Sequence, residues 1–144
     1  MYPNTNLPSR QAVNALLIGR FGADRGFLRQ LFRNSGWKLR MAANPRRALT
    51  CLHRNLIHVV LASSEIPGWT WQTVLHEVSK LSPRPALVVV SRLADDRLWA
   101  EVLNLGGYDL LAQPFDRSEV ERVVLSARRH FDPPSLRLAS ASAA

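Results

Sequence analysis

Short apolar runs alternate along the chain with segments of helical periodicity, and this alternation predicts parallel strand–helix–strand units. Strands are predicted where apolar residues follow one another without a break, and helices where they recur every three or four positions. The predicted strands are Val13–Gly19, Trp37–Ala42, Ile57–Ala62, Ala86–Val90 and Tyr108–Ala112. The predicted helices run from about Asp24 to Ser35, from Asn44–Pro45 onward, from about Thr70 to Leu81, from Asp95 to Leu105, and from Asp116 to about Phe131.

Five strands and five helices in strict alternation predict an α/β fold, a flavodoxin-like doubly wound parallel sheet with strand order 2-1-3-4-5 in a three-layer sandwich. The domain is expected over residues 13–131, after an N-terminal extension at 1–12. The small, polar, proline-broken tail at 132–144 is expected to be disordered. Such folds place their chemistry at the carboxyl ends of the strands. Those ends carry Gly19–Arg20, Ser63, Ser91 and Gln113.

Local signals refine the first helix. Asp24 is a plausible N-cap, and Gly36 is a plausible stop at the carboxyl end. The apolar side chains predicted to face the sheet are Phe27, Leu28, Leu31 and Phe32.

Composition restricts the class of protein. The chain has 144 residues, 47% of them apolar and 21% charged, which are values of a single globular domain. No apolar run approaches the roughly 20 residues of a membrane span, and the N-terminus has no secretory pattern, so a cytoplasmic location is expected. The single cysteine, Cys51, is expected to be a small buried hydrophobe.

The net charge of +8 is the unusual bulk property, and Lys38 and Lys80 are the only lysines. A basic, arginine-rich surface attracts nucleic acid or acidic proteins. The charges are scattered without a dense basic run, so the sequence supports nucleic-acid binding only weakly. The four histidines show no metal-ligand spacing, and no phosphate-binding glycine motif occurs.

Three segments, in order and at the right spacing, resemble the receiver domain of two-component response regulators. Ile66-Pro67-Gly68 is similar to the turn after the phosphoacceptor strand. The run from Val88 to Ser91 is similar to the strand that ends in the switch hydroxyl. The segment from Gly106 to Phe115 resembles the family's G-A-x-D-Y-h-x-K-P-F, in which the Lys–Pro bond is typically cis.

The resemblance implies a site that has lost most of its parts. The family uses two acids after the first strand to hold Mg²⁺, and an aspartate after the third strand as nucleophile. It also uses a hydroxyl after the fourth strand and a lysine before the proline. The matching positions here are Gly19 and Arg20, Ser63, Ser91, and Gln113 before Pro114. Only the hydroxyl remains, so no metal and no other cofactor is expected.

Two of these positions leave alternatives. A serine needs a base to become a nucleophile, and none is placed for Ser63, so a hydrogen-bonding role in the loop is favoured over phosphotransfer. The guanidinium of Arg20 either fills the former metal site and pairs with Glu65 or Asp24, or turns into solvent. The family's switch aromatic falls at Leu110, and Arg92 follows Ser91 where a small residue is common. The resemblance therefore implies that the switch is dismantled.

Several residues are candidates for an interaction surface. At least one of Trp69 and Trp71 is expected to be exposed. Arg25, Arg29 and Arg33 recur every four residues on the first helix, as a solvated face or a surface for an acidic partner. By resemblance, Leu98, Trp99 and Val102 belong to a dimerisation face made by the fourth helix, the fifth strand and the fifth helix.

The prediction is a degenerate receiver-like domain in bacterial two-component or phosphorelay-type signalling. It is expected to be no enzyme, to bind a signalling protein independently of phosphorylation, and to have no membrane contact. The alternative is a nucleic-acid-associated basic protein that uses its arginine-rich surface.

Overall fold

The structure is a computed structural model and describes residues 12–131. The tail predicted at 132–144, and all but Ala12 of the predicted N-terminal extension, lie outside the described residues. No helix within residues 12–131 is both long and apolar enough to cross a membrane.

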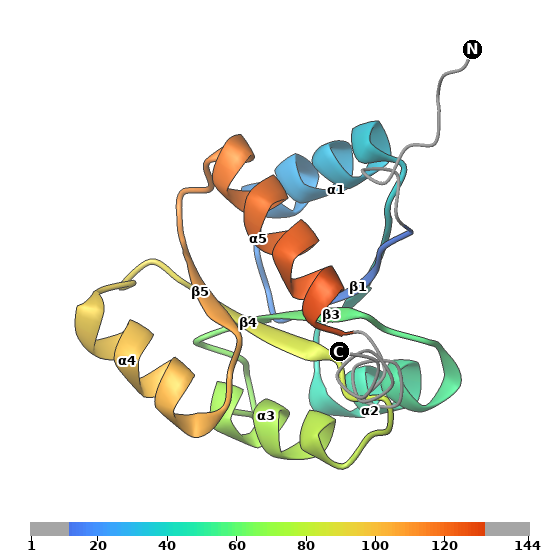
Figure 1. The fold of residues 1–144 in the computed structure, drawn as a ribbon, viewed down its shortest axis with the longest axis vertical. Helices are drawn as coiled ribbons and strands as arrows, with labels where there is room; N and C mark the ends of the chain where they lie inside the picture. Colours follow the sequence, from blue (N-terminus) through green and yellow to red (C-terminus); the bar gives the residue numbers. More distant parts are fainter. Residues whose placement is uncertain (1–11, 132–144) are drawn as a thin grey trace, which may run out of the picture.

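Five parallel strands form one sheet in the order β2-β1-β3-β4-β5 (Figure 1). The predicted fold class and strand order are confirmed. The strands are β1 (Asn14–Ile18), β2 (Lys38–Ala42), β3 (Val59–Ser63), β4 (Ala86–Ser91) and β5 (Asp109–Ala112). The helices are α1 (Ala23–Ser35), α2 (Pro45–Arg54), α3 (Trp71–Ser79), α4 (Asp96–Leu105) and α5 (Arg117–His130).

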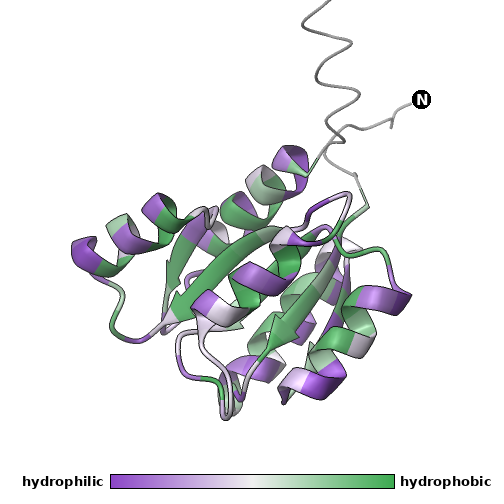
Figure 2. Cartoon of the chain, turned by 90° about the horizontal axis from the view of Figure 1, so that it is seen from below, coloured by the Kyte–Doolittle hydropathy of each residue, from purple (hydrophilic) through white to green (hydrophobic). Residues whose placement is uncertain are grey.

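The helices cover both faces of the sheet. Helices α1 and α5 lie on one face, and α2, α3 and α4 lie on the other (Figure 1). Alternate residues of β1 serve the two layers: Leu17 packs with α1 and α5, whereas Leu16 packs with α2 and α3. The central strands β1, β3 and β4 are mostly apolar, as a sheet covered on both faces requires, whereas the edge strand β2 also carries Lys38 and Arg40. The helices carry one apolar side (Figure 2).

Capping residues set several helix boundaries where the sequence predicts them. Asn44 accepts a hydrogen bond from the Arg47 amide at 3.0 Å, with Pro45 in the first turn of α2. Asp116 accepts one from the Glu119 amide at 3.0 Å and begins α5. Gly36 ends α1 in the left-handed conformation, with φ of 72°.

Three local predictions are wrong. Asp24 is no N-cap, because α1 begins at Ala23 and its cap residue is Gly22, which makes no side-chain cap bond. Phe27 lies at the margin of the apolar stripe and is 37% exposed, where its ring stacks on Phe115 at 5.9 Å. Cys51 is half-buried rather than buried, although burial still raises the pKa of its thiol.

Candidate functional site

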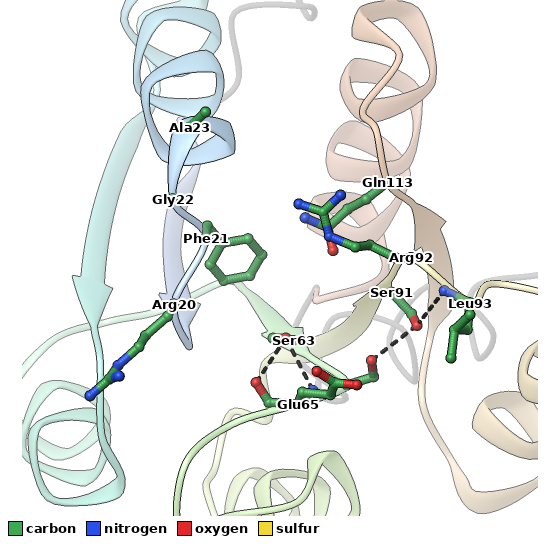
Figure 3. A pocket seen from close by; sticks show the side chains of 11 residues that line it. Arg20, Phe21, Gly22, Ala23, Ser63, Glu65, Ser91, Arg92, Leu93 and Gln113 are labelled. Carbon is green, nitrogen blue, oxygen red and sulfur yellow. Dashed lines mark hydrogen bonds between the residues drawn. The ribbon is translucent and has the colours of Figure 1, made fainter.

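The carboxyl ends of the strands border a cavity of about 280 Å³ (Figure 3). It gathers most of the residues predicted for the site from loops far apart in the sequence. Residues of the cavity wall are Arg20, Phe21, Gly22, Ala23, Ser63, Ser64, Glu65, Ser91, Arg92, Leu93 and Gln113. Gly19, Leu110 and Pro114 do not line the cavity, and the Gln113–Pro114 bond is cis, as the resemblance implies.

Ser63 uses its hydroxyl within its own loop. Its Oγ donates to the Glu65 carbonyl at 3.1 Å and accepts from the Glu65 amide at 3.1 Å. These two bonds turn the chain away from β3 toward the Pro67–Gly68 turn. No hydrogen bond of the described residues joins Ser63 to a histidine or a carboxylate, so nothing here activates it as a nucleophile.

Ser91 is a buried connection between two loops. Its side chain accepts from the Leu93 amide and from the Ser64 hydroxyl, each at 3.0 Å (Figure 3). The Gln113 amide donates to the Ser91 carbonyl, also at 3.0 Å. With 3% of its surface exposed, Ser91 joins the loops after β3 and β4 through its hydroxyl and the end of β5 through its main-chain carbonyl.

A side chain at Gly19 would strain this backbone. Its φ is +126°, a region that residues with a Cβ rarely adopt. A Cβ there would lie 2.8 Å from the Cβ of Ser63 and 3.4 Å from the ring of Phe21. A carboxylate at the position that the resemblance assigns to a metal-binding acid would therefore be strained and crowded.

Arg20 takes the outward of its two predicted arrangements. It is exposed and points away from Ser63 and Glu65, toward β2 and α2 (Figure 3). The position that the resemblance assigns to the metal is thus not filled by this guanidinium, because the chain turns at Gly19 and directs the next side chain to the outer edge of the sheet.

Asp24 takes the charged contacts instead. The side-chain amide of Gln113 donates to the Asp24 carboxylate at 2.7 Å, and the Arg92 guanidinium lies 3.8 Å from the same carboxylate oxygen. The Arg92 side chain is 73% exposed, so the ion pair contributes about 1 kcal/mol at most. These contacts join the start of α1 to the loops after β4 and β5.

The cavity offers hydroxyls, an amide and exposed charges, but no set of metal ligands. Within residues 12–131 no three histidine, cysteine or acidic side chains gather where they could hold a metal ion. Glu65 is exposed at the rim, and the carboxylate of Asp24 is engaged with Gln113. The arrangement can bind through hydrogen bonds, and it contains no paired nucleophile and base.

Sequence reasoning missed the roles of three residues at this site. Asp24 was expected as a cap, and its contacts with Arg92 and Gln113 had no signal in the sequence, because they bridge segments far apart in the chain. Ser64 directly follows Ser63 at the end of β3, so the sequence did show a second hydroxyl that could reach Ser91. Phe21 is buried beside Gly19, and its ring faces the cavity (Figure 3).

Two predictions about the surface are wrong. Trp71 is buried and Trp69 half-buried, because the Trp69 amide donates to the Ile66 carbonyl at 3.0 Å and folds the turn back onto the core. Val102 is fully buried on the side of α4 that faces the sheet, and Leu98 is half-buried. Trp99 is 48% exposed.

Solved structures share this fold, whereas no protein-family model matches the chain. The signal receiver domain of an HD domain-containing protein from Pseudomonas fluorescens Pf-5 matches 84% of this chain and 98% of its own. Its TM-score is 0.74 at 22% identity. The receiver domain of the Francisella response regulator 1452 matches 82% of this chain and 98% of its own, with a TM-score of 0.73 at 19% identity.

The chain has the receiver fold. One curated protein adds sequence similarity to this fold: the C4-dicarboxylate transport transcriptional regulatory protein DctD of Rhizobium meliloti (strain 1021). It is 25% identical over 105 residues, which make up 73% of this chain and 22% of DctD. The chain thus spans about a fifth of that relative, over a segment the size of one receiver fold.

Proposed function

We propose that this receiver-like domain acts in two-component signalling, in the cytoplasm, as a protein-interaction module that does not depend on phosphorylation. The observation that carries the proposal is the contact between Gly19 and Ser63. It leaves no room for a metal-binding acid beside the position where the family has its nucleophile. The similarity to receiver folds supports the signalling context.

Phosphotransfer to this site would lack a nucleophile, a metal and the lysine that the family has before its proline. The hydroxyl of Ser63 is committed to Glu65, and Gln113 supplies an amide where the family has a lysine. Mg²⁺ prefers oxygen ligands, and neither Gly19 nor Arg20 provides a carboxylate. Without the ion, the negative charge of a transferred phosphoryl group would have no metal to offset it.

An apolar strip on and beside α4 supports the role in protein interaction. Trp99 and Leu103 are four residues apart on one side of α4, 48% and 36% exposed. Leu93 before the helix and Leu105 at its end are 75% and 53% exposed. Four of the six large exposed hydrophobic side chains of residues 12–131 thus belong to this region, and such clusters are typical of protein contacts.

The partner is proposed to be a signalling protein or a second copy of this chain at the face made by α4, β5 and α5. The receiver domain of the yeast response regulator Ssk1 has been crystallised with the phosphotransfer protein Ypd1. It has 12% identity to this chain and a TM-score of 0.70. The exposed arginines of α1, Arg25, Arg29 and Arg33, are a second proposed contact, for an acidic partner.

The first experiment tests for phosphorylation directly. The protein is incubated with acetyl phosphate and Mg²⁺, and intact mass spectrometry is expected to find no added phosphoryl group. Ser63→Ala is the matched control. A stable phosphoryl group that is present on the parent and absent from Ser63→Ala would refute the proposal.

The second experiment tests the apolar strip. Trp99→Ala/Leu103→Ala is compared with Leu56→Ala, which removes an exposed leucine outside α4. We expect the double variant to lose the partners captured from the native host, or the self-association seen by light scattering, while Leu56→Ala keeps them. Equal behaviour of the two variants would contradict an interaction through α4.

A further inference from the structure

Six arginines border two neighbouring hollows at the β2 edge of the sheet. One hollow, of about 660 Å³, lies between β2 and α2, and the other, of about 510 Å³, lies between the end of β2 and the start of α1. Met41 and Arg47 line both hollows, so the two lie side by side. We call the two hollows together the arginine trough, and its cations are Arg20, Arg25, Arg40, Arg46, Arg47 and Arg54.

The positive charge of the arginine trough is not neutralised by the described protein. No aspartate or glutamate lines either hollow. The three ion pairs found among residues 12–131 involve none of the six arginines, and all six are exposed. The Arg20 side chain points away from Ser63 and Glu65, and this direction adds one of these charges to the trough (Figure 3).

The first turn of α2 increases the positive potential. It contains Arg46 and Arg47 and no acid, although the amino end of a helix favours negative charge. This arrangement costs the folded protein some stability, and a bound anion would offset the cost. Local choices that oppose the fold are concentrated at functional surfaces.

The lining of the trough favours nucleic acid over an acidic protein. None of the large exposed hydrophobic side chains of residues 12–131 lines the trough. Stable protein interfaces need apolar or aromatic anchors at their centre, whereas nucleic-acid interfaces are polar and strongly basic. We propose that the arginine trough binds the phosphate backbone of nucleic acid, without reading its sequence.

The chemistry of recognition is that of the guanidinium group. It donates two parallel hydrogen bonds to one phosphate and keeps its charge at any physiological pH. The trough lies at β2 and the apolar strip at α4, beyond β4 and β5 at the other edge of the sheet. Nucleic acid and a protein partner can therefore bind the same molecule at the same time.

The test measures binding of a fluorescent DNA duplex of arbitrary sequence by anisotropy at several salt concentrations. The trough variant, Arg46→Gln/Arg47→Gln/Arg54→Gln, is compared with Arg29→Gln/Arg33→Gln/Arg122→Gln. The second set removes three exposed arginines outside the trough and lowers the charge equally from +8. Circular dichroism verifies that both variants fold.

We expect the trough variant to lose about tenfold or more in affinity at low salt, and the control about threefold or less. The slope of log affinity against log salt should fall by about 2 to 3 in the trough variant, since each phosphate contact contributes about 0.9. Absence of binding at low salt, or equal losses in the two variants, would overturn the proposal. So would a labelled polyglutamate that binds more tightly than the duplex and is released by the trough substitutions, because it would assign the trough to an acidic protein.

Discussion

Gly19 and Ser63 set the chemistry of the strand-end cavity at the scale of single residues. The end of β1 passes so close to the Ser63 side chain that a Cβ on Gly19 would lie at 2.8 Å. Residue identity alone suggests that an acid could simply be put back at this position. The backbone does not allow it, because φ at Gly19 is +126°.

Gly19→Asp is therefore expected to destabilise the fold without creating a magnesium site. The combination of a positive φ and a steric overlap should cost about 2 to 4 kcal/mol. Urea unfolding measures the loss, and calorimetric titration with Mg²⁺ measures binding. Arg20→Asp, at an exposed position, is the matched control and should cost less than about 1 kcal/mol. A stable Gly19→Asp protein that binds Mg²⁺ would show that this account of the site is wrong.

His58, directly before β3, is a buried titratable group. It is 4% exposed, its Nδ1 accepts from the Asn14 amide at 2.9 Å, and its ring packs edge-on against Phe131. Burial, with a smaller contribution from the charge of Arg128, lowers the pKa of His58 to about 4. The ring is thus neutral in the folded protein, with its proton on Nε2.

The pH dependence of stability follows from this pKa. The unfolded chain binds a proton at His58 near pH 6.5 and the folded protein only near pH 4. The folded state therefore loses stability as the pH falls from about 6.5 to about 4, by up to about 3 kcal/mol. Urea unfolding measures the free energy of unfolding across this pH range. It should depend less on pH for His58→Asn than for the parent, because Asn keeps an acceptor for the Asn14 amide but does not titrate. Identical curves for the two proteins would count against the assignment.

The strand-end residues could be read from the sequence, but the direction of their side chains could not. Ser63, Ser91 and Gln113 lie where the strand pattern predicts. Arg20 left two arrangements open, because a long side chain after a turn takes its direction from backbone angles that the sequence does not specify. The contact of Arg92 with Asp24 is a tertiary one for the same reason.

At the scale of elements, α4 shows how caps and stripes act together. Asp95 accepts from the Leu98 amide at 2.8 Å and begins the helix, and Gly106 ends it in the left-handed conformation. Between them Val102 is buried against the sheet while Trp99 and Leu103 remain outside. The cap thus fixes where α4 begins, and so which of its apolar side chains face solvent.

Asp95→Ala should cost about 1 kcal/mol of unfolding free energy, because an amide of the first turn loses its acceptor. Thermal or urea unfolding measures this change. Asp95→Asn retains a side-chain oxygen and should recover most of the loss. If the asparagine variant is as unstable as the alanine variant, the cap is not the source of the effect.

The elements were predictable to within a residue or two because apolar periodicity, prolines and capping residues agree along the chain. The errors fell where tertiary packing overrides a local signal. Asp24 resembles a cap but lies within the first turn of α1. Trp69 appears to lie in an exposed loop, yet a bridge to Ile66 folds it back toward the core.

At the scale of the whole molecule, charge acts against the fold. The net charge is +8, and the arginine trough concentrates six of the cations at one edge of the sheet. Like charges repel in the compact state, and salt screens this repulsion over about 8 Å at physiological ionic strength.

Stability should therefore rise when salt is increased from about 0.01 M to about 0.15 M. The melting temperature of the full chain measures the effect, expected to be a few degrees. Arg46→Gln/Arg47→Gln/Arg54→Gln should show a smaller rise than the parent. A fall in melting temperature with salt would mean that attractive ion pairs, not repulsion, dominate the surface.

Strand order was predictable at this scale because alternating strands and helices with short connections admit few topologies. The arginine trough was not, although its arginines are visible in the sequence as scattered charges. Residues from the end of β1, the start of α1, β2 and α2 come together only once the sheet is ordered. Scatter along a chain is thus a poor guide to scatter on a surface.

The close approach of Gly19 to Ser63 also restricts the mutational paths open to this protein. Replacing Ser63 by aspartate, a change of one residue, would add an acceptor without a metal and offer selection nothing to retain. Replacing Gly19 would first require the loop after β1 to change its conformation. The protein would lose stability at that step, before any metal could bind. The independence from phosphorylation that we propose is therefore expected to be hard to reverse by single substitutions.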